Sequence, residues 1–153
     1  MKLKLATASD THTLGVRLAS ILAPGDLLVL SGPLGAGKTA LTQGIGAGLA
    51  VEGAVTSPTF IIARVHRGRI PLVHVDAYRL SSADELDDLD LDASLEDSVT
   101  VVEWGAGLVE QLADAHLAID LERRDDDVRD VTVTGHGGDW EQRLSRWEAG
   151  AAC

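Results

Sequence analysis

The sequence predicts one α/β domain over residues 1–153, in which a sheet of parallel strands is extended by antiparallel hairpins and flanked by helices. Three observations favour this class. An apolar, branched run at Leu27–Ser31 leads into a glycine-rich loop and a helical segment, the order that begins a parallel α/β unit. Two pairs of short alternating segments are typical of hairpins. A chain of 153 residues suits one hydrophobic core.

The first half of the chain is expected to supply a strand, two helices and the central strand between them. Lys2–Ala6 alternates like a strand, and Ser9 and Asp10 are expected to cap the next helix. The helix after the glycine loop is expected to end near residues 46–49. Three glycines within it indicate either close packing or a frayed end. They are Gly44, Gly46 and Gly48.

The second half is expected to hold two hairpins, a buried strand and three short helices. The expected elements are the hairpins 60–66/70–76 and 116–122/128–134, the strand 99–102, and helices opened by a capping box at 82–85, at 106–113 and at about 139–148. Residues 149–153 are expected to be a disordered tail. Trp140, Leu144 and Trp147 form one stripe of the terminal helix, and packing is the preferred interpretation of that stripe.

The glycine-rich loop, Gly32–Thr39, reads GPLGAGKT and fits the phosphate-binding pattern G-x-x-x-x-G-K-[S/T] at every fixed position. Glycines let backbone N–H groups approach phosphate oxygens, and the following helix N-terminus favours anions. Lys38 can reach the β- and γ-phosphates, and Thr39 can offer its hydroxyl to Mg²⁺. A plain glycine-rich turn is the alternative, which the flanking strand and helix disfavour. The fold is therefore predicted to be P-loop NTPase-like.

Two acidic residues end strands that could lie beside this loop. Asp76 ends the run Leu72–Asp76, which fits a Walker B strand apart from His74, and Glu103 ends the run Val99–Glu103. Open α/β sheets place ligands at the carboxyl ends of their strands. Either acid could hold Mg²⁺ as far as spacing alone is concerned, and either could be a plain strand-end acid. His74 is interpreted as a buried structural histidine.

Charge and composition narrow the possible partners. The net charge of −11 and the pI near 4.7 disfavour a broad nucleic-acid surface, DNA included, because phosphate backbones need Lys/Arg patches. Arg64, Arg67 and Arg69 leave a local basic spot open against the alternative of a solvated hairpin tip. No apolar run reaches the roughly 18 residues of a membrane span, so no membrane is expected as a partner. The single cysteine, Cys153, cannot form an internal disulfide, and a cytoplasmic protein is expected.

Five segments occur in an order that carries a family resemblance. They are Gly25-Asp26, Ser31–Thr39, Thr56–Phe60 (TSPTF), His74–Leu80 (HVDAYRL) and Glu103-Trp104. With them the chain resembles the TsaE family, also called YjeE, the small bacterial P-loop ATPases of the threonylcarbamoyladenosine tRNA-modification pathway. The resemblance runs from Thr7 to about Val133. The phosphate loop alone is unspecific, whereas the other segments at these spacings are highly specific.

The resemblance implies a role for each matching residue. Thr39 and Glu103 would coordinate Mg²⁺, and Asp76 would act near the γ-phosphate. Thr59 would lie in a switch-like segment, Trp104 beside the nucleotide, and Thr7 and Arg129 on the adenosine side. The implied catalytic set is Lys38, Asp76 and Glu103, and the implied ATP-binding set is Thr7, Gly32, Gly35, Ala36, Gly37, Lys38, Thr39, Ala40, Thr59, Trp104 and Arg129.

The implied function is a Mg²⁺-dependent ATPase, weak alone, that supports threonylcarbamoyl transfer to adenosine 37 of tRNA. The transferase TsaD and its paralogue TsaB would be the partners, and tRNA would be reached through them. A small-molecule P-loop kinase is the alternative, although no arginine-rich lid is evident. A nucleotide-bound module without turnover also stays open. A GTPase is excluded because the chain has no asparagine for the Asn-Lys-x-Asp motif.

Overall fold

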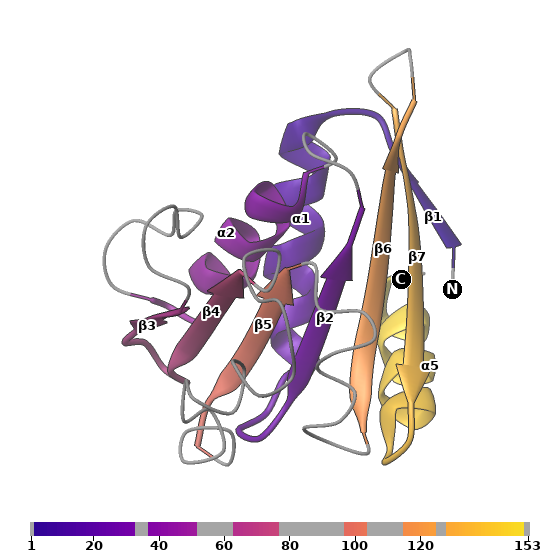
Figure 1. Ribbon diagram of the computed structural model, residues 1–153. Helices are drawn as coiled ribbons and strands as arrows, with labels where there is room; N and C mark the ends of the chain where they lie inside the picture. The colour runs from indigo at the N-terminus through magenta and orange to yellow at the C-terminus, as the bar shows by residue number, and fades with distance from the viewer. Residues whose placement is uncertain are drawn as a thin grey trace.

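The computed structural model describes residues 2–32, 37–51, 63–76, 97–103, 115–124 and 128–151. These residues form one seven-stranded sheet with helices against it (Figure 1). The predicted helices near 82–85 and at 106–113 lie outside the described residues. No helix in the described ranges is long and apolar enough to cross a membrane.

The sheet has four parallel strands at its centre and antiparallel strands at both edges. Its order is β1 (Lys2–Leu5), β7 (Arg129–His136), β6 (His116–Arg123), β2 (Leu27–Ser31), β5 (Val99–Glu103), β4 (Leu72–Asp76) and β3 (Ala63–His66). The two predicted hairpins are confirmed as the pairs β3–β4 and β6–β7. Because β5 and β6 flank β2 on opposite sides, the carboxyl end of β2 is a crevice position of the kind that binds ligands in open α/β sheets.

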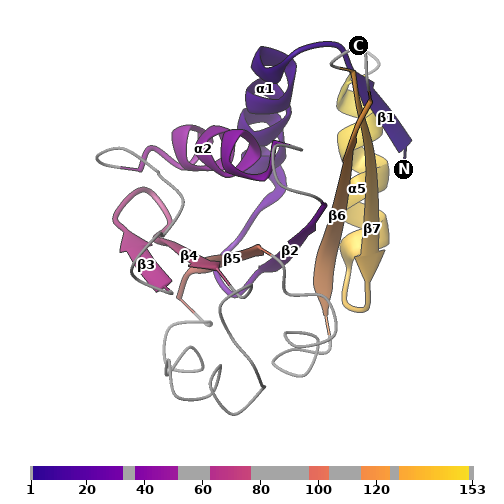
Figure 2. The same cartoon turned by 45° about the horizontal axis from the view of Figure 1, so that its top comes forward.

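Among the described residues, three helices cover one face of the sheet. Figure 2 shows α1 (Ala8–Leu18) and α2 (Lys38–Gly48) over the β2–β5–β4 part, and α5 (Trp140–Ala151) alongside β6 and β7. A short 3-10 turn, Ala19–Ile21, follows α1. Apolar residues of all three helices join alternate residues of the strands in one buried cluster. This core fixes the helix starts relative to the strand ends.

The first helix is capped two residues earlier than the sequence suggested. Thr7, not Ser9 or Asp10, is the N-cap: its hydroxyl accepts from the Asp10 amide at 3.2 Å, and the Asp10 carboxylate accepts from the Thr7 amide at 3.2 Å. Thr-x-x-Asp provides the reciprocal pair of a capping box. Ser9 cannot compete because it already lies in the first turn. The prediction of the cap at Ser9-Asp10 was therefore wrong.

Close packing, not fraying, explains the glycines of α2. A Cβ atom on Gly44 would overlap the carbonyl oxygen of His12, and a Cβ on Gly15 would overlap that of Leu41. A Cβ on Gly48 would in turn overlap the Cβ of Ala19. The backbones of α1 and α2 therefore touch where they cross. This contact holds the phosphate-loop helix rigidly against α1.

The terminal helix is longer than predicted. It runs through Ala151, so the expected end at 148 and the expected disordered tail from 149 were wrong for residues up to 151. Trp140, Leu144 and Trp147 are buried, which confirms the packing stripe. The Trp147 indole donates to the carbonyl oxygen of Arg17 in α1 at 3.2 Å. Residues 149–152 are alanines and one glycine, so no periodic pattern of large apolar residues indicated that the helix continues.

Arg143 fastens α5 to the turn before β2. Its Nη1 atom donates to Asp26 at 2.7 Å, and its Nε atom lies 3.0 Å from Asp139. The hydrogen bond to Asp26 is the main cause that raises the pKa of Arg143 above its ordinary value. An arginine guanidinium keeps its charge in proteins, so Arg143 pairs with Asp26 as a cation.

Replacing Arg143 with methionine is expected to lower the free energy of unfolding by about 2 kcal/mol, because the buried carboxylate of Asp26 loses its charged partner. Urea unfolding followed by circular dichroism measures the change. Arg146 is exposed on the same helix, and the matched Arg146→Met substitution should change stability by less than about 0.5 kcal/mol. Equal losses from the two substitutions would contradict the role given to Arg143.

Candidate functional site

The phosphate-loop motif joins the carboxyl end of β2 to the start of α2. Gly32, directly after β2, has a φ of 142°, and Gly37, the N-cap of α2, has a φ of 110°. Side chains rarely tolerate these backbone conformations, so both fixed glycines of the motif are required by the chain path. Gly35 and Ala36 lie outside the described residues.

Lys38 reaches back across this loop. It is the first residue of α2 and is only 6% exposed, and its Nζ atom donates to the carbonyl oxygen of Gly32 at 2.5 Å. Thr39 and Ala40 follow in the first helical turn, where backbone N–H groups have no partner within the helix. A cationic side chain and outward-pointing amides therefore meet at one point, an arrangement that favours an anion.

The strand register aligns the two acidic residues with this loop. Asp76 at the end of β4 pairs in register with Glu103 at the end of β5, and Glu103 pairs with Leu30, two residues before Gly32. Glu103 is 2% exposed. For Asp76 the structure describes the backbone only. The backbones of both residues therefore end at the carboxyl edge of the sheet beside the loop.

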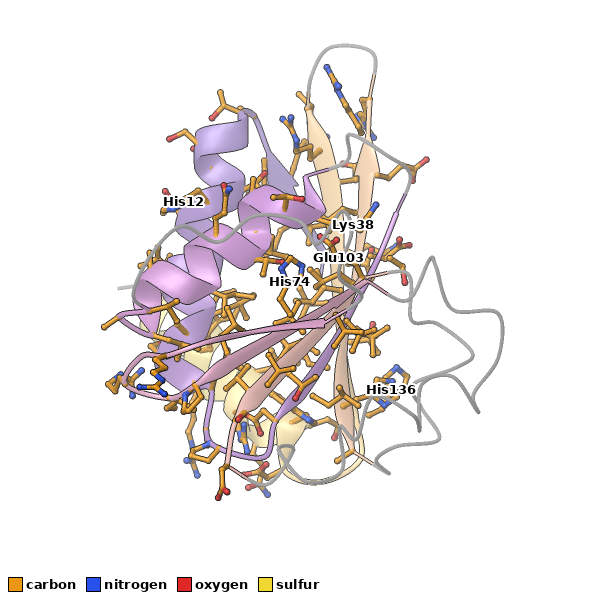
Figure 3. The ribbon with its side chains drawn as sticks, turned by 60° about the vertical axis from the view of Figure 1, so that its left-hand side comes forward. His12, Lys38, His74, Glu103 and His136 are labelled. Atoms are coloured by element: carbon orange, nitrogen blue, oxygen red, sulfur yellow. The ribbon has the colours of Figure 1, made fainter. Side chains whose placement is uncertain are left out.

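His74 lies beneath Glu103. It is fully buried, as the sequence predicted, and its Nε2 atom is 3.6 Å from the Glu103 Oε1 atom. Figure 3 shows Lys38, Glu103 and His74 gathered between α2 and the strand ends, away from His136. His136 ends β7 at the opposite edge of the sheet, because β7 runs antiparallel to the central strands. The sequence had not indicated the contact between His74 and Glu103.

Arg129 brings a second buried cation to the same edge. It begins β7, is 7% exposed, and its Nε atom lies 3.3 Å from where a Cβ of Gly37 would sit. The methyl group of Thr11, in α1, lies 3.4 Å from the same point. The side chains of Arg129 and Thr11 therefore lie next to Gly37, the last glycine of the loop. Sequence reasoning missed Thr11, which carries no motif signal of its own.

Of the remaining predicted site residues, the structure describes Thr7 only. Thr7 lies at the same edge, between β1 and α1, and its hydroxyl serves as the cap of α1. Thr59 and Trp104 lie outside the described residues. In the ranges that the structure describes, no group of three or more His, Cys, Asp or Glu residues gathers in the manner of a self-contained metal centre.

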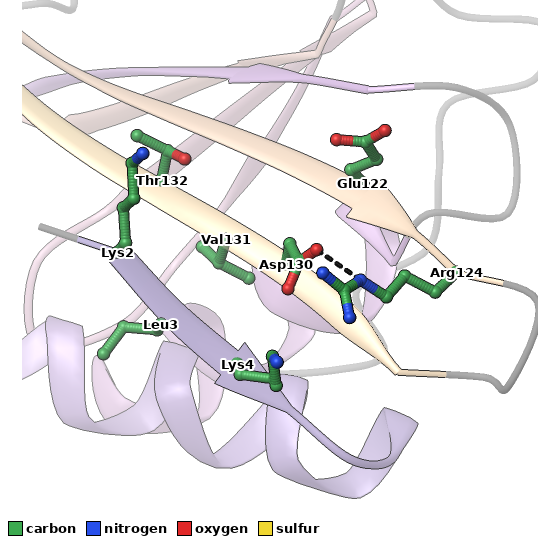
Figure 4. A pocket seen from close by; sticks show the side chains of 8 residues that line it. All are labelled: Lys2, Leu3, Lys4, Glu122, Arg124, Asp130, Val131 and Thr132. Atoms are coloured by element: carbon green, nitrogen blue, oxygen red, sulfur yellow. Dashed lines mark hydrogen bonds and ion pairs between the residues drawn. The ribbon is translucent and has the colours of Figure 1, made fainter.

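A hollow of about 470 Å³ lies on the face of β1, β6 and β7 that points away from the helices (Figure 4). Lys2, Lys4 and Glu122 line it, together with Arg124 and Asp130, which pair with each other at 2.6 Å. Charges of both signs compensate one another there. The hollow lacks the buried cations and helix N-terminus of the carboxyl edge, which remains the candidate site.

Comparison with known proteins bears directly on the geometry of this edge. The family model described as "Threonylcarbamoyl adenosine biosynthesis protein TsaE" matches residues 5–131. This span includes the phosphate loop, both acidic residues and Arg129. The chain belongs to the TsaE family.

Curated TsaE proteins of several bacteria resemble the chain over most of its length. The protein of Streptomyces coelicolor is 61% identical over 135 residues, which cover 83% of this chain and 91% of that protein. The protein of Bacillus subtilis is 39% identical over 151 residues, or 95% of this chain and 94% of its own. Each bears the description "tRNA threonylcarbamoyladenosine biosynthesis protein TsaE".

A solved bacterial structure has the same architecture. The crystal structure of Bacillus subtilis YdiB matches with a TM-score of 0.80 and 32% sequence identity, and the match covers 99% of this chain and 95% of that chain. The predicted fold class, a parallel sheet with antiparallel extensions and flanking helices, is thereby confirmed. Helix α5 lies beyond the residues that the TsaE family model matches.

Proposed function

We propose that this chain binds ATP with Mg²⁺ at the carboxyl edge of β2 and β5, hydrolyses it, and thereby supports threonylcarbamoylation of tRNA adenosine 37. One observation carries the proposal. The buried ammonium of Lys38 and the buried carboxylate of Glu103 both lie at the carboxyl end of β2. Lys38 is held there by its hydrogen bond to Gly32, and Glu103 by the pairing of β5 with β2. Membership of the TsaE family supports the assignment to this pathway.

The polar groups of this edge fit a nucleotide triphosphate. Lys38 and Arg129 are buried cations at the start of α2 and β7, and positive charge beside a helix N-terminus favours an anionic ligand. Gly32 and Gly37 keep the loop free of side chains where the backbone must approach the phosphates. Lys38 would bind the β- and γ-phosphates, and the amides of Gly37, Thr39 and Ala40 would donate to phosphate oxygens.

The same edge offers ligands that suit Mg²⁺. Magnesium prefers oxygen donors and is commonly held by one or two protein oxygens plus phosphates. The Thr39 hydroxyl and the Glu103 carboxylate would be those donors. When bound, the metal neutralises charge that develops on the transferred phosphoryl group. Asp76, in register beside Glu103, would accept a hydrogen bond from the attacking water and orient it.

The other residues would recognise the remainder of the nucleotide and report its state. Thr7 and Arg129 would contact the adenosine side, Trp104 would lie beside the nucleotide, and Thr59 would sense whether the γ-phosphate is present. The position of the Arg129 side chain beside the last glycine of the loop supports the contact proposed for it.

Replacing Arg129 with methionine is expected to weaken ATP binding about 10-fold, because a charge-assisted hydrogen bond to the ligand is lost. Isothermal titration calorimetry with a non-hydrolysable ATP analogue measures this affinity. Arg123 faces Arg129 across the β6–β7 pair and is exposed, so Arg123→Met is the matched control and should leave the affinity within about 2-fold. An unchanged affinity in the Arg129 variant would remove Arg129 from the site.

The acidic character of the chain suits a role among proteins more than direct tRNA binding. With a net charge of −11, it would act in the cytoplasm on a complex of TsaD and TsaB, and those partners would hold the tRNA. ATP hydrolysis would reset the complex between rounds of transfer.

Reconstitution tests this function. TsaB, TsaD, tRNA and the threonylcarbamoyl donor are combined with ATP, and modified adenosine is counted per TsaD molecule with and without this chain. Product beyond one equivalent should require the chain and should be lost with Lys38→Ala. Repeated turnover without the chain would contradict the proposal, and ATP-dependent phosphorylation of a small molecule would favour the kinase alternative.

A further inference from the structure

A fully buried histidine interrupts an otherwise apolar strand of the core. His74 lies in β4 between Val73 and Val75, its register partner on β5 is Val101, and its exposed fraction is 0%. In the described part of the chain, neither of its ring nitrogens has a hydrogen-bond partner. Leaving a buried polar group without a hydrogen bond is destabilising, so an apolar residue would suit this position better for packing alone.

The polar neighbour of this ring is the Glu103 carboxylate. The Nε2 atom of His74 lies 3.6 Å from the Oε1 atom of Glu103, and the side chain of Glu103 is only 3% exposed. The distance exceeds a hydrogen bond by about 0.4 Å, and such contacts often shorten when a site is loaded. A nitrogen lone pair facing a carboxylate would be repelled, so the Nε2 atom that faces Glu103 is expected to carry a hydrogen.

The strand register explains why this contact forms. Asp76 pairs with Glu103, and His74 lies two residues before Asp76 on the same face of β4. The histidine is therefore one step deeper in the sheet than the acidic edge, below Glu103 and out of contact with solvent. A donor at this depth can hold the Oε1 atom of the carboxylate from within the sheet.

We propose that His74 is a positioning residue: its Nε2–H group fixes the Glu103 carboxylate in the orientation that binds Mg²⁺. This inference rests on the proposed function, because it assigns Glu103 to the metal. His74 itself touches neither the metal nor the phosphates. Residues that hydrogen-bond to metal ligands commonly contribute about 10- to 100-fold to metal affinity.

The test measures magnesium dependence apart from catalysis. Affinity for a non-hydrolysable ATP analogue is titrated with Mg²⁺, and the same affinity is measured in EDTA. His74→Leu should raise about 10-fold the Mg²⁺ concentration that gives half of the maximal gain in analogue affinity. The affinity in EDTA should stay within about 2-fold of the wild-type value. His74→Gln, which retains an N–H donor, should recover most of the loss. His136→Leu is the matched control at the far edge of the sheet and should behave as the wild type.

A double-mutant cycle shows whether His74 acts through Glu103. In a Glu103→Gln background, His74→Leu should add no further loss of magnesium affinity. If the leucine variant does not fold, His74→Asn replaces it, since its shorter amide does not reach Glu103. Normal magnesium dependence in the folded variant, or an equal loss in EDTA, would overturn the inference. A wild-type chain without magnesium-dependent ATP binding would instead contradict the proposed function itself.

Discussion

Substituting alanine for Gly44 is expected to lower the free energy of unfolding by about 3 kcal/mol, although alanine favours helices by about 1 kcal/mol over glycine. The added methyl group would overlap the His12 carbonyl oxygen, so α1 and α2 would have to move apart. Chemical denaturation measures the loss. Because α2 begins with the phosphate loop, ATP affinity in the folded fraction should fall as well.

Ala47 provides the control for Gly44. It lies on the same helix and is exposed, so Ala47→Val adds bulk to α2 without entering the contact with α1. We expect this control to cost less than about 1 kcal/mol, from helix propensity alone. A stable Gly44→Ala protein would show that the two helices separate easily, and the rigid crossing inferred from the glycines would then be wrong.

Lys38→Ala is expected to reduce ATP hydrolysis by at least about 100-fold, because in the proposed site Lys38 would supply the positive charge nearest the phosphates, in the first turn of α2. Hydrolysis is measured in the presence of the TsaB–TsaD complex, where turnover is expected to be highest. The affinity for ATP should fall at the same time, since a buried cation is removed from an anion site.

Lys4 is the natural control for Lys38 because the chain has only three lysines. It is exposed on the edge strand β1, beside the hollow of Figure 4, and Lys4→Ala should leave hydrolysis unchanged. If both variants retain full activity, the phosphates are bound elsewhere. Circular dichroism of each variant separates lost chemistry from lost folding.

The sequence predicted the elements whose signals are local. The central strand and the glycine loop were recognised from consecutive residues, and both hairpins from alternation between turn residues. Lys38 and Thr39 were placed at a helix start because the motif itself contains that geometry. Such features depend on a few neighbouring residues, and no knowledge of the strand order is needed to predict them.

The contacts that assemble the edge are non-local and were harder to predict. The alignment of Asp76 with Glu103 depends on β4 lying beside β5, and the contact of Arg129 with Gly37 depends on β7 returning past α1. The family resemblance identified these residues but did not show which of them contact one another in the folded chain. His74 was expected to be buried, yet only the register reveals which carboxylate it meets.

Two errors concerned the ends of helices. Thr7 was assigned to the nucleotide alone, so its competing role as the cap of α1 was overlooked. The end of α5 was placed early because residues 149–152 are small and lack an apolar period. The start of α1 is set by the Thr7–Asp10 capping box, a local signal that the expected cap at Ser9-Asp10 overlooked.

The most direct test is a crystal structure of the chain with Mg²⁺ and a non-hydrolysable ATP analogue. We predict that the phosphates lie over the N-terminus of α2, with the metal about 2.1 Å from the Thr39 hydroxyl and from a Glu103 oxygen. A nucleotide bound away from residues 37–40, or a metal that touches neither side chain, would contradict the assignment of this edge as the ATP site.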